Sequence, residues 1–168
     1  MAWTAPRTWV TGEVVTAAIM NAHVRDNLIE LGPRVIKSAD ESVTSSTTLQ
    51  NDDHLVLAVD VNSRYILILD ILWVGATAGD LKYAFTVPAS ATIFGFDSEQ
   101  AGGVAVDLTG AIAVESGHGT AVQALRIVAV ADIAGTSGNV QFQFAQNTSD
   151  ATATTVKQGS RLMAHKVI

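Results

Sequence analysis

The pattern of apolar and polar positions divides the chain into two parts. From residue 35 onward, short apolar segments alternate with breaks rich in Gly, Asn, Asp and Ser. This rhythm is typical of the short strands of an antiparallel sandwich or barrel. No segment has the pattern of a helix crossing between parallel strands, which argues against an α/β sheet. We therefore predict a mainly β fold, an antiparallel sandwich or barrel preceded by an N-terminal arm and one α-helix.

Eleven segments carry the strand pattern. They are Val35–Ser38, Ser42–Ser45, Leu55–Asp60, Arg64–Val74, Leu81–Val87, Ala91–Phe96, Val104–Leu108, Ala121–Ala131, Asn139–Gln146, Thr154–Lys157 and Arg161–Val167. In "QFQFAQ", apolar and polar positions alternate, with Phe142 and Phe144 directed to a core and Gln141 and Gln143 to the opposite face. Such a strand has one face in contact with water.

The segment "YILILDILWV" is apolar on both faces. One face holds Tyr65, Leu67, Leu69, Ile71 and Trp73, and the other holds Ile66, Ile68, Leu72 and Val74 together with Asp70. Because one face of an antiparallel sheet commonly meets solvent, the second apolar face needs cover from the N-terminal helix or from another subunit. We favour a subunit. The residues predicted to form the core or a subunit interface are Tyr65, Ile66, Ile68, Leu72, Trp73, Phe142 and Phe144.

The first 33 residues form a separate part, and we place the β domain at residues 34–168. The opening "MAWTAPRTWV" reads as an extended arm whose Trp3 and Trp9 need a surface to pack on. From Thr11 the pattern predicts a helix, with Thr11 as N-cap, Glu13 in the first turn and Gly32–Pro33 as its end.

The predicted helix has apolar residues around much of its circumference. A seam with coiled-coil spacing is formed by Val14, Ala17, Asn21, Val24, Leu28 and Leu31. Fewer than three heptads do not hold a free coiled coil, so this helix needs a partner surface. The partner surface is either its own sandwich or another protein.

The motif "NAHVRDNL" places His23, Arg25, Asp26 and Asn27 within about one helical turn. His23 and Asp26 have the spacing of a base and its orienting carboxylate, but no nucleophilic Ser or Thr stands nearby. We interpret the group as the polar side of an attachment element. The predicted attachment residues are Trp3, Trp9, Asn21, His23, Arg25, Asp26 and Asn27.

Metal and catalytic patterns are weak, and we predict no metal, no cofactor and no catalytic residue. The four histidines lie far apart, without the spacing of a helical zinc site. The acidic run Asn51–His54 lacks the glycine and final glutamate of a calcium loop, so we expect an exposed turn before a strand. The glycines of Ala101–Gly103 and Ser116–Thr120 are expected in hairpin turns.

Charge and composition narrow the choice of partner. The 168 residues include 10 Lys and Arg against 16 Asp and Glu, a net charge of −6 without a basic cluster. This argues against nucleic acid and anionic membranes as partners. The absence of cysteine excludes disulfides and thiolate sites and is compatible with a reducing cytosol. No signal peptide or membrane span is visible, so we expect a soluble chain.

The run "TWVTGEVVTAAIMNAHVRDNL", Thr8 to Leu28, resembles a leader of structural proteins of tailed bacteriophages and their prophages, in which a tryptophan, Gly-Glu, Met-Asn and Arg-Asp-Asn recur. The run "GNVQFQFAQNTSDATATTVKQGSRLMAHKV" is similar to the last strands of phage β-domains, and the layout from Val35 to Ile168 resembles a jelly roll of the tumour-necrosis-factor type. This second resemblance rests on strand rhythm and on Tyr65, Phe142, Phe144, Ala145, Gln146, Gly159 and Ser160.

The resemblance implies a virion component assembled in the host cytoplasm, commonly a homotrimer whose leader attaches it to the particle. Its partners would be the major capsid protein or tail proteins of the same virion, with a host surface ligand as a further partner. The short length and the lack of a fibrous repeat favour head decoration over a tail fibre or tail-tip receptor-binding protein.

A third alternative is a virion-borne glycan-degrading enzyme, which needs two carboxylates facing across a groove. Asp70 is the acidic residue to inspect, because its strand neighbours are apolar. We favour a paired or interface carboxylate at this position.

Overall fold

The computed structural model describes residues 4–5, 7–27, 34–98, 105–114 and 119–167, and the statements below concern these residues. A short helix, α1 (Ala17–Met20), continues into a π-helical segment, η1 (Asn21–Arg25). The strands are β1 (Arg34–Ile36), β2 (Glu41–Val43), β3 (Gln50–Val59), β4 (Ser63–Gly75), β5 (Leu81–Thr86), β6 (Thr92–Asp97), β7 (Val106–Asp107), β8 (Ile112–Val114), β9 (Gly119–Ile133), β10 (Gly138–Ala145), β11 (Thr154–Val156) and β12 (Arg161–Lys166).

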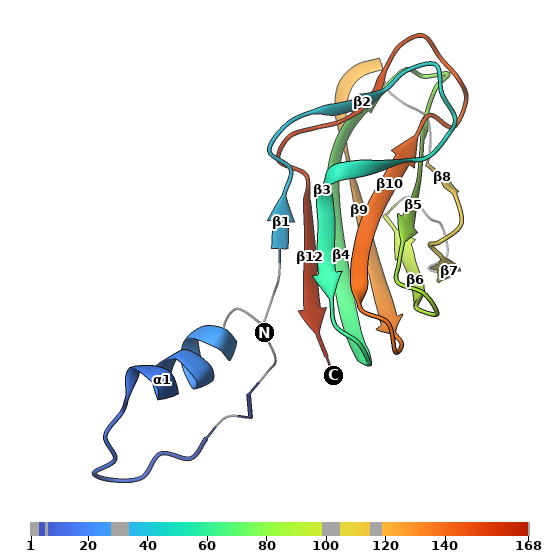
Figure 1. Cartoon of the computed structure of the whole chain (residues 1–168). Coiled ribbons are helices and arrows are strands. Elements are labelled where there is room, and N and C mark those ends of the chain that lie inside the picture. The colour runs from blue at the N-terminus through green and yellow to red at the C-terminus, as the bar shows by residue number, and fades with distance from the viewer. Residues whose placement is uncertain (1–3, 6, 28–33, 99–104, 115–118, 168) are drawn as a thin grey trace.

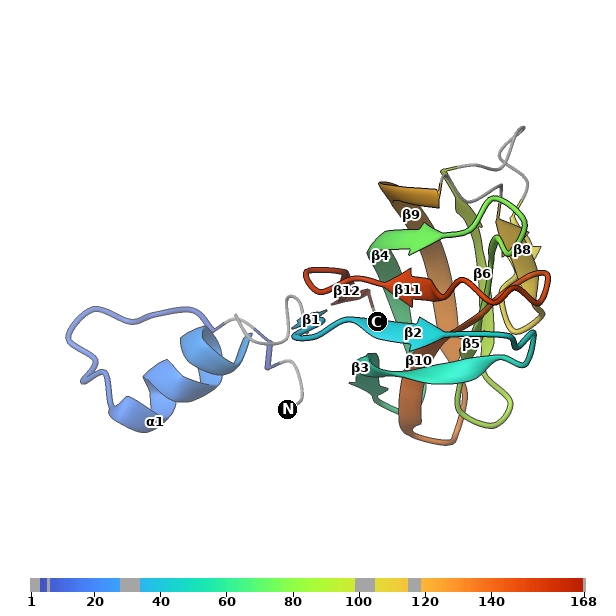
Figure 2. The same cartoon turned by 90° about the horizontal axis from the view of Figure 1, so that it is seen from above.

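The strands form two antiparallel sheets packed face to face (Figures 1 and 2). The larger sheet has the order β1-β12-β4-β9-β6-β7, with β11 pairing with both β4 and β2, and the smaller sheet has the order β3-β10-β5-β8. The consecutive strands β3 and β4, and likewise β9 and β10, lie in opposite sheets. The mainly antiparallel β-sandwich is therefore confirmed, whereas a tumour-necrosis-factor-like jelly roll stays a prediction.

The core lies between the two sheets. The inward face of β4 contributes Tyr65, Leu67, Leu69, Ile71 and Trp73, all buried, because alternate residues of a strand point to the same face. Opposite them, β10 contributes Phe142 and Phe144, whose ring centroids lie 6.3 Å apart. Tyr65, Trp73, Phe142 and Phe144 thus belong to the core of one chain.

The helix begins later than predicted. Its N-cap is Thr16, whose Oγ1 accepts a hydrogen bond from the Ile19 N–H, and not Thr11. Gly12 has φ +82°, a left-handed conformation that breaks a helix there. Val14 therefore precedes the helix, so the predicted seam is wrong at its start, and the predicted end at Gly32–Pro33 lies outside the described residues.

The segment Asn51–His54 was predicted to be an exposed turn, and this prediction is wrong. These residues belong to β3, and Asp52 is fully buried. The strand continues through the acidic run because an ammonium group compensates the charge of Asp52, as described below. Strand β8 (Ile112–Val114) was not predicted. The turn expected at Ala101–Gly103 lies outside the described residues, as do residues 116–118 of the second expected turn.

The arm and helix lie beside the sandwich rather than against either sheet (Figures 1 and 2). The chain enters the sandwich through β1, a three-residue strand that pairs with β12 at the edge of the larger sheet. The division into an attachment segment and a β domain stays a prediction, with β1 beginning at Arg34.

Candidate interaction surfaces

The first candidate is the outer face of the larger sheet, defined as the side of β12, β4, β9 and β6 that points away from β3 and β10. Strand register places Ile66 beside Val130, and Val130 beside Phe94, in one row across three strands. The next row joins Ile68, Val128 and Phe96. The two rows form an apolar band across the middle of the sheet.

These apolar side chains remain exposed. The exposed fractions are 39% for Ile66, 38% for Leu72, 48% for Phe94, 43% for Phe96 and 41% for Val130. At the edge of the same face, Ile36 of β1 is 62% exposed and pairs in register with Arg161. Of the predicted interface residues, Ile66, Ile68 and Leu72 lie on this face. The apolar band of the two rows is continuous, and an exposed patch of this kind commonly marks an interaction site.

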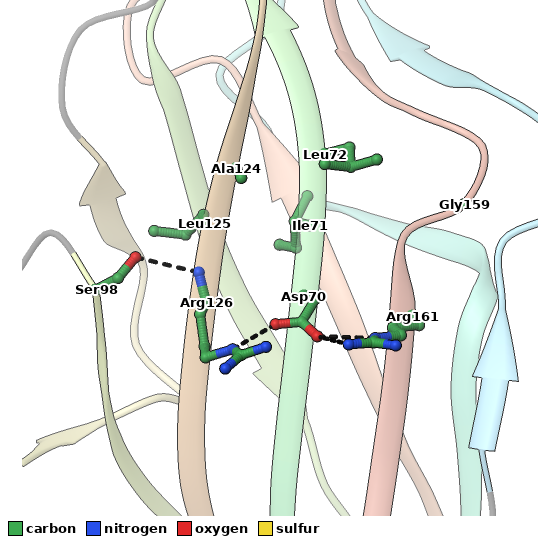
Figure 3. Close-up of a pocket in the computed structure, with 9 residues that line it drawn as sticks. All are labelled: Asp70, Ile71, Leu72, Ser98, Ala124, Leu125, Arg126, Gly159 and Arg161. Atoms are coloured by element: carbon green, nitrogen blue, oxygen red, sulfur yellow. Dashed lines mark hydrogen bonds and ion pairs between the residues drawn. The ribbon is translucent and has the colours of Figure 1, made fainter.

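A charged row interrupts the apolar surface (Figure 3). Arg126 lies on β9, and its Nε donates to Asp70 Oδ1 at a distance of 2.6 Å. Arg161 lies on β12, and its Nε donates to Asp70 Oδ2 at a distance of 2.8 Å. The hydrogen bond from Arg126 is the main cause that lowers the pKa of Asp70, and Arg161 acts in the same direction. Two cations and one anion give this row a formal charge of +1.

Beside the charged row the surface is hollowed, with a cavity volume of about 480 Å³. Leu72, Ala124 and Gly159 line it together with the charged row (Figure 3). Gly159 has φ +90°, a left-handed conformation that favours glycine, so no side chain stands at this position. The hollow therefore exists because the residues on both sides of Leu72 are small.

The second candidate is the N-terminal arm with its helix. Asn27 is buried, and its Oδ1 accepts from the Thr4 N–H at 3.0 Å while its Nδ2 donates to the Thr4 carbonyl at 2.9 Å. Arg7 forms an ion pair with Glu13, and its guanidinium lies 5.1 Å from the centroid of the Trp9 ring. The arm is thus folded back and fastened to the helix by Asn27.

Most of the arm's apolar side chains have no cover within the described part of the chain. Val10 is 69% exposed, Val14 79%, Val15 50% and Trp9 46%. Further along, Met20 and Val24 are also exposed. A segment this apolar and this open gains free energy when it docks on another surface.

The other predicted attachment residues differ from one another in exposure and in hydrogen bonding. Asn21 is exposed, and Trp3 lies outside the described residues. Arg25 donates to Asp26 at 2.7 Å, so Asp26 is paired with arginine and not with His23. The Nδ1 of His23 is buried without a hydrogen-bond partner among the described residues. Among the described residues, His23 and Asp26 form no hydrogen bond with each other, so they do not make the pair of a base and its orienting carboxylate.

A cluster of possible metal ligands is formed by residues of β2 and β3. Ligand atoms of Glu41, Asp52 and His54 come within 4.8 Å of one another. The fully buried Lys37 reaches into this group, with its Nζ 2.7 Å from Asp52 Oδ2, 2.8 Å from Glu41 Oε2 and 3.5 Å from His54 Nδ1. The lysine ammonium therefore takes the position that a cation would need, and we interpret the cluster as a structural ion-pair network.

Sequence reasoning missed two residues of the candidate sites, Lys37 and Arg126. Lys37 gave no signal beyond alternation, because Val35, Lys37 and their neighbours read as an ordinary edge strand. Arg126 lies in a segment predicted as a strand, but only the register of β4 and β9 shows that it faces Asp70. The available signal in the sequence was the opposite charge of Asp70 and Arg126, each within an otherwise apolar strand segment.

No protein-family model and no curated protein matches the chain. Among solved structures it is similar to the tripod (BppUct-A-L) from the baseplate of bacteriophage Tuc2009, at 9% sequence identity and a TM-score of 0.38. The match covers 98% of this chain and 76% of that chain. A similarity this low carries no argument about function. Within the described residues, no helix has the length and apolar character to cross a membrane.

Proposed function

We propose that the chain is a structural component of a tailed-phage virion, a homotrimeric capsid decoration protein that docks on the particle through its N-terminal arm and helix. The observation that carries the proposal is the presence of two separate exposed apolar surfaces on one small chain, the arm and the outer face. The resemblance of Thr8–Leu28 to phage leaders supports the choice of particle.

The outer face has the area that self-association requires. With roughly 200 Å² for a phenylalanine side chain and less for an aliphatic one, its exposed fractions sum to apolar area on the order of 500 Å². A standard interface buries about 800 Å² per partner, and about 65% of a homodimer interface is apolar, so the expected apolar area is also about 500 Å². The outer face therefore suits contact with further copies of the same chain.

The arm suits contact with a different protein. Within the described residues, the helical segment begins at Ala17 and leaves Met20 and Val24 exposed, so its apolar side chains are available for packing on another protein. Three arms held by one trimer bind at high effective concentration, so modest contacts of each arm add up to firm attachment. The function we propose is thus binding without chemistry.

The hydrogen bonds of Asp70 are relevant to the alternative that the chain is a glycan-degrading enzyme. Both of its carboxylate oxygens accept hydrogen bonds from arginine, which lowers its pKa. A general acid for glycoside cleavage needs the opposite, a raised pKa. The surroundings of Asp70 therefore favour a paired interface carboxylate.

The test separates the two surfaces by substitution. Ile66→Ser with Phe94→Ser is expected to shift sedimentation from trimer to monomer, while Val61→Ser, an exposed apolar residue between β3 and β4, leaves the trimer intact. Trp9→Ala is expected to keep the trimer and weaken binding to particles that lack the protein. If Trp9→Ala dissociates the trimer, this division of roles is wrong.

Immunogold electron microscopy of intact particles, with an antibody against the β domain, tests the location. Label over the head supports decoration, and label confined to the tail refutes decoration in favour of a tail fibre or receptor-binding protein. A turnover assay on capsular polysaccharide tests the enzyme alternative, and cleavage by the purified protein would refute a purely structural role.

A further inference from the structure

The charged row of the outer face, Arg161, Asp70 and Arg126, has a role that the apolar band does not explain. We propose that this row, with the hollow beside it, binds a carboxylate side chain of a neighbouring copy and so fixes the register of the assembly. The inference rests on the homo-oligomer of the proposed function. To the apolar interface between copies, the inference adds a polar contact between the charged row and the neighbour's carboxylate.

Among the described residues, the contacts of the row leave one positive charge without an acidic partner. Asp70 accepts the Nε–H of Arg126 at 2.6 Å, and it accepts from both Nε and a terminal nitrogen of Arg161 at 2.8 Å. A guanidinium carries five N–H donors, and Asp70 engages Arg126 through Nε. The Arg126 side chain is 58% exposed, so its terminal nitrogens are open to a second acceptor.

The surroundings make that charge costly in an interface. Ile68 and Val128 lie in the adjacent row of the face on one side, and Leu72 and Ala124 in the adjacent row on the other. When a second copy covers these apolar residues, the row loses contact with water. Removing a charge from water without a partner is strongly unfavourable, so stable association requires an anion opposite the row.

The chain itself supplies the anion, and the surface has room for it. Each copy carries 16 acidic against 10 basic residues, so carboxylates are in excess on every neighbour. The hollow of about 480 Å³ opens on the outer face, because Ala124 and Gly159 are small on either side of Leu72. A carboxylate reaching in from a neighbour would meet the two-pronged donor geometry that arginine offers.

The experiment measures the association constant by sedimentation equilibrium at low and high sodium chloride. The wild-type association is expected to weaken as salt rises, since salt screens the contact. Arg126→Gln makes the row neutral and is expected to weaken association about tenfold at low salt and to flatten the salt dependence. Arg126→Lys keeps the charge and is expected to retain the salt dependence.

A matched control removes a balanced pair from the same face. Arg64 and Asp132 form an ion pair between β4 and β9, so the double variant Arg64→Gln with Asp132→Asn leaves the net charge unchanged. It is expected to keep the wild-type salt dependence. Circular dichroism on each variant verifies that the β-sandwich is folded.

The outcomes distinguish this inference from the proposed function. If Arg126→Gln assembles like wild type while Ile66→Ser with Phe94→Ser does not, the carboxylate contact is wrong and the apolar interface stands. If wild type is monomeric at every salt concentration, the assembly itself is wrong. If citrate binds the monomer through Arg126 and assembly is indifferent to Arg126→Gln, the hollow takes a small anion and the inference is overturned.

Discussion

Lys37 offers a sharp test of how this fold is held together. Its side chain is fully buried, and its ammonium lies 2.7 Å from Asp52 Oδ2 and 2.8 Å from Glu41 Oε2. The Asp52 carboxylate is equally buried. Replacing Lys37 with Met keeps much of the side-chain volume and removes the charge, so the change isolates the ion pair from packing.

The magnitude follows from the partner left behind. In Lys37→Met, Asp52 keeps the hydrogen bonds to its Oδ1 from the His54 and Leu55 N–H groups, each 2.9 Å long, and loses the cation at Oδ2. Removing one partner of a buried pair costs about 4 kcal/mol. For a chain of this size, roughly 3 °C of Tm is lost per kcal/mol, so Tm is expected to fall by about 12 °C.

The assay is denaturant unfolding followed by tryptophan fluorescence, since Trp73 is buried in the core. The matched control is Lys37→Met with Asp52→Asn, in which the amide oxygen still accepts from the His54 N–H and no fully buried charge remains. Glu41, which is partly exposed, keeps its charge and its hydrogen bond from the Asp53 N–H in both variants. This double variant is expected to recover at least half of the lost stability. A loss below about 1 kcal/mol in Lys37→Met would refute the argument that the ammonium compensates Asp52.

Three further changes test contacts within the fold. Gly95→Ala puts a Cβ 2.4 Å from the Val128 carbonyl oxygen, so β6 must move from β9, and calorimetry is expected to show a loss of about 3 kcal/mol. Asn27→Ala removes both hydrogen bonds to Thr4, and amide exchange in the arm is expected to rise while the sandwich is unchanged. Trp73→Ala leaves a core cavity and is expected to cost about 4 kcal/mol in chemical denaturation. Unchanged exchange at Thr4, or a stable Gly95→Ala or Trp73→Ala protein, would contradict these assignments.

The strand pattern was predictable where burial follows alternation. Along β4, the positions Tyr65 to Trp73 alternate between buried and more exposed side chains, and a period of two reads directly from sequence. The same alternation separates Phe142 and Phe144 from Gln141 and Gln143. Local periodicity carries this information, because each residue's face depends only on its neighbours in the strand.

Long-range pairing explains what the sequence did not reveal. Asp52 has the sequence surroundings of a turn residue, since its partner Lys37 lies 15 positions away, directly after β1. Thr11 looked like a helix cap, but Gly12 adopts a positive φ that no periodicity records. The charged row around Asp70 depends on the register of β12, β4 and β9, which composition does not encode.

The way the arm joins the sandwich has a mechanical consequence. The arm continues into β1, whose three residues pair antiparallel with β12, and the next residue is the buried Lys37. Any tension along the arm therefore reaches β1 before it reaches the core strands. A pull along β1 loads its hydrogen bonds to β12 in shear. After these bonds, the next contact that the force reaches is the ion pair of Lys37 with Asp52 of β3. In the proposed function, a force from the particle would enter the sandwich at β1, which the buried ion pair of Lys37 and Asp52 directly follows.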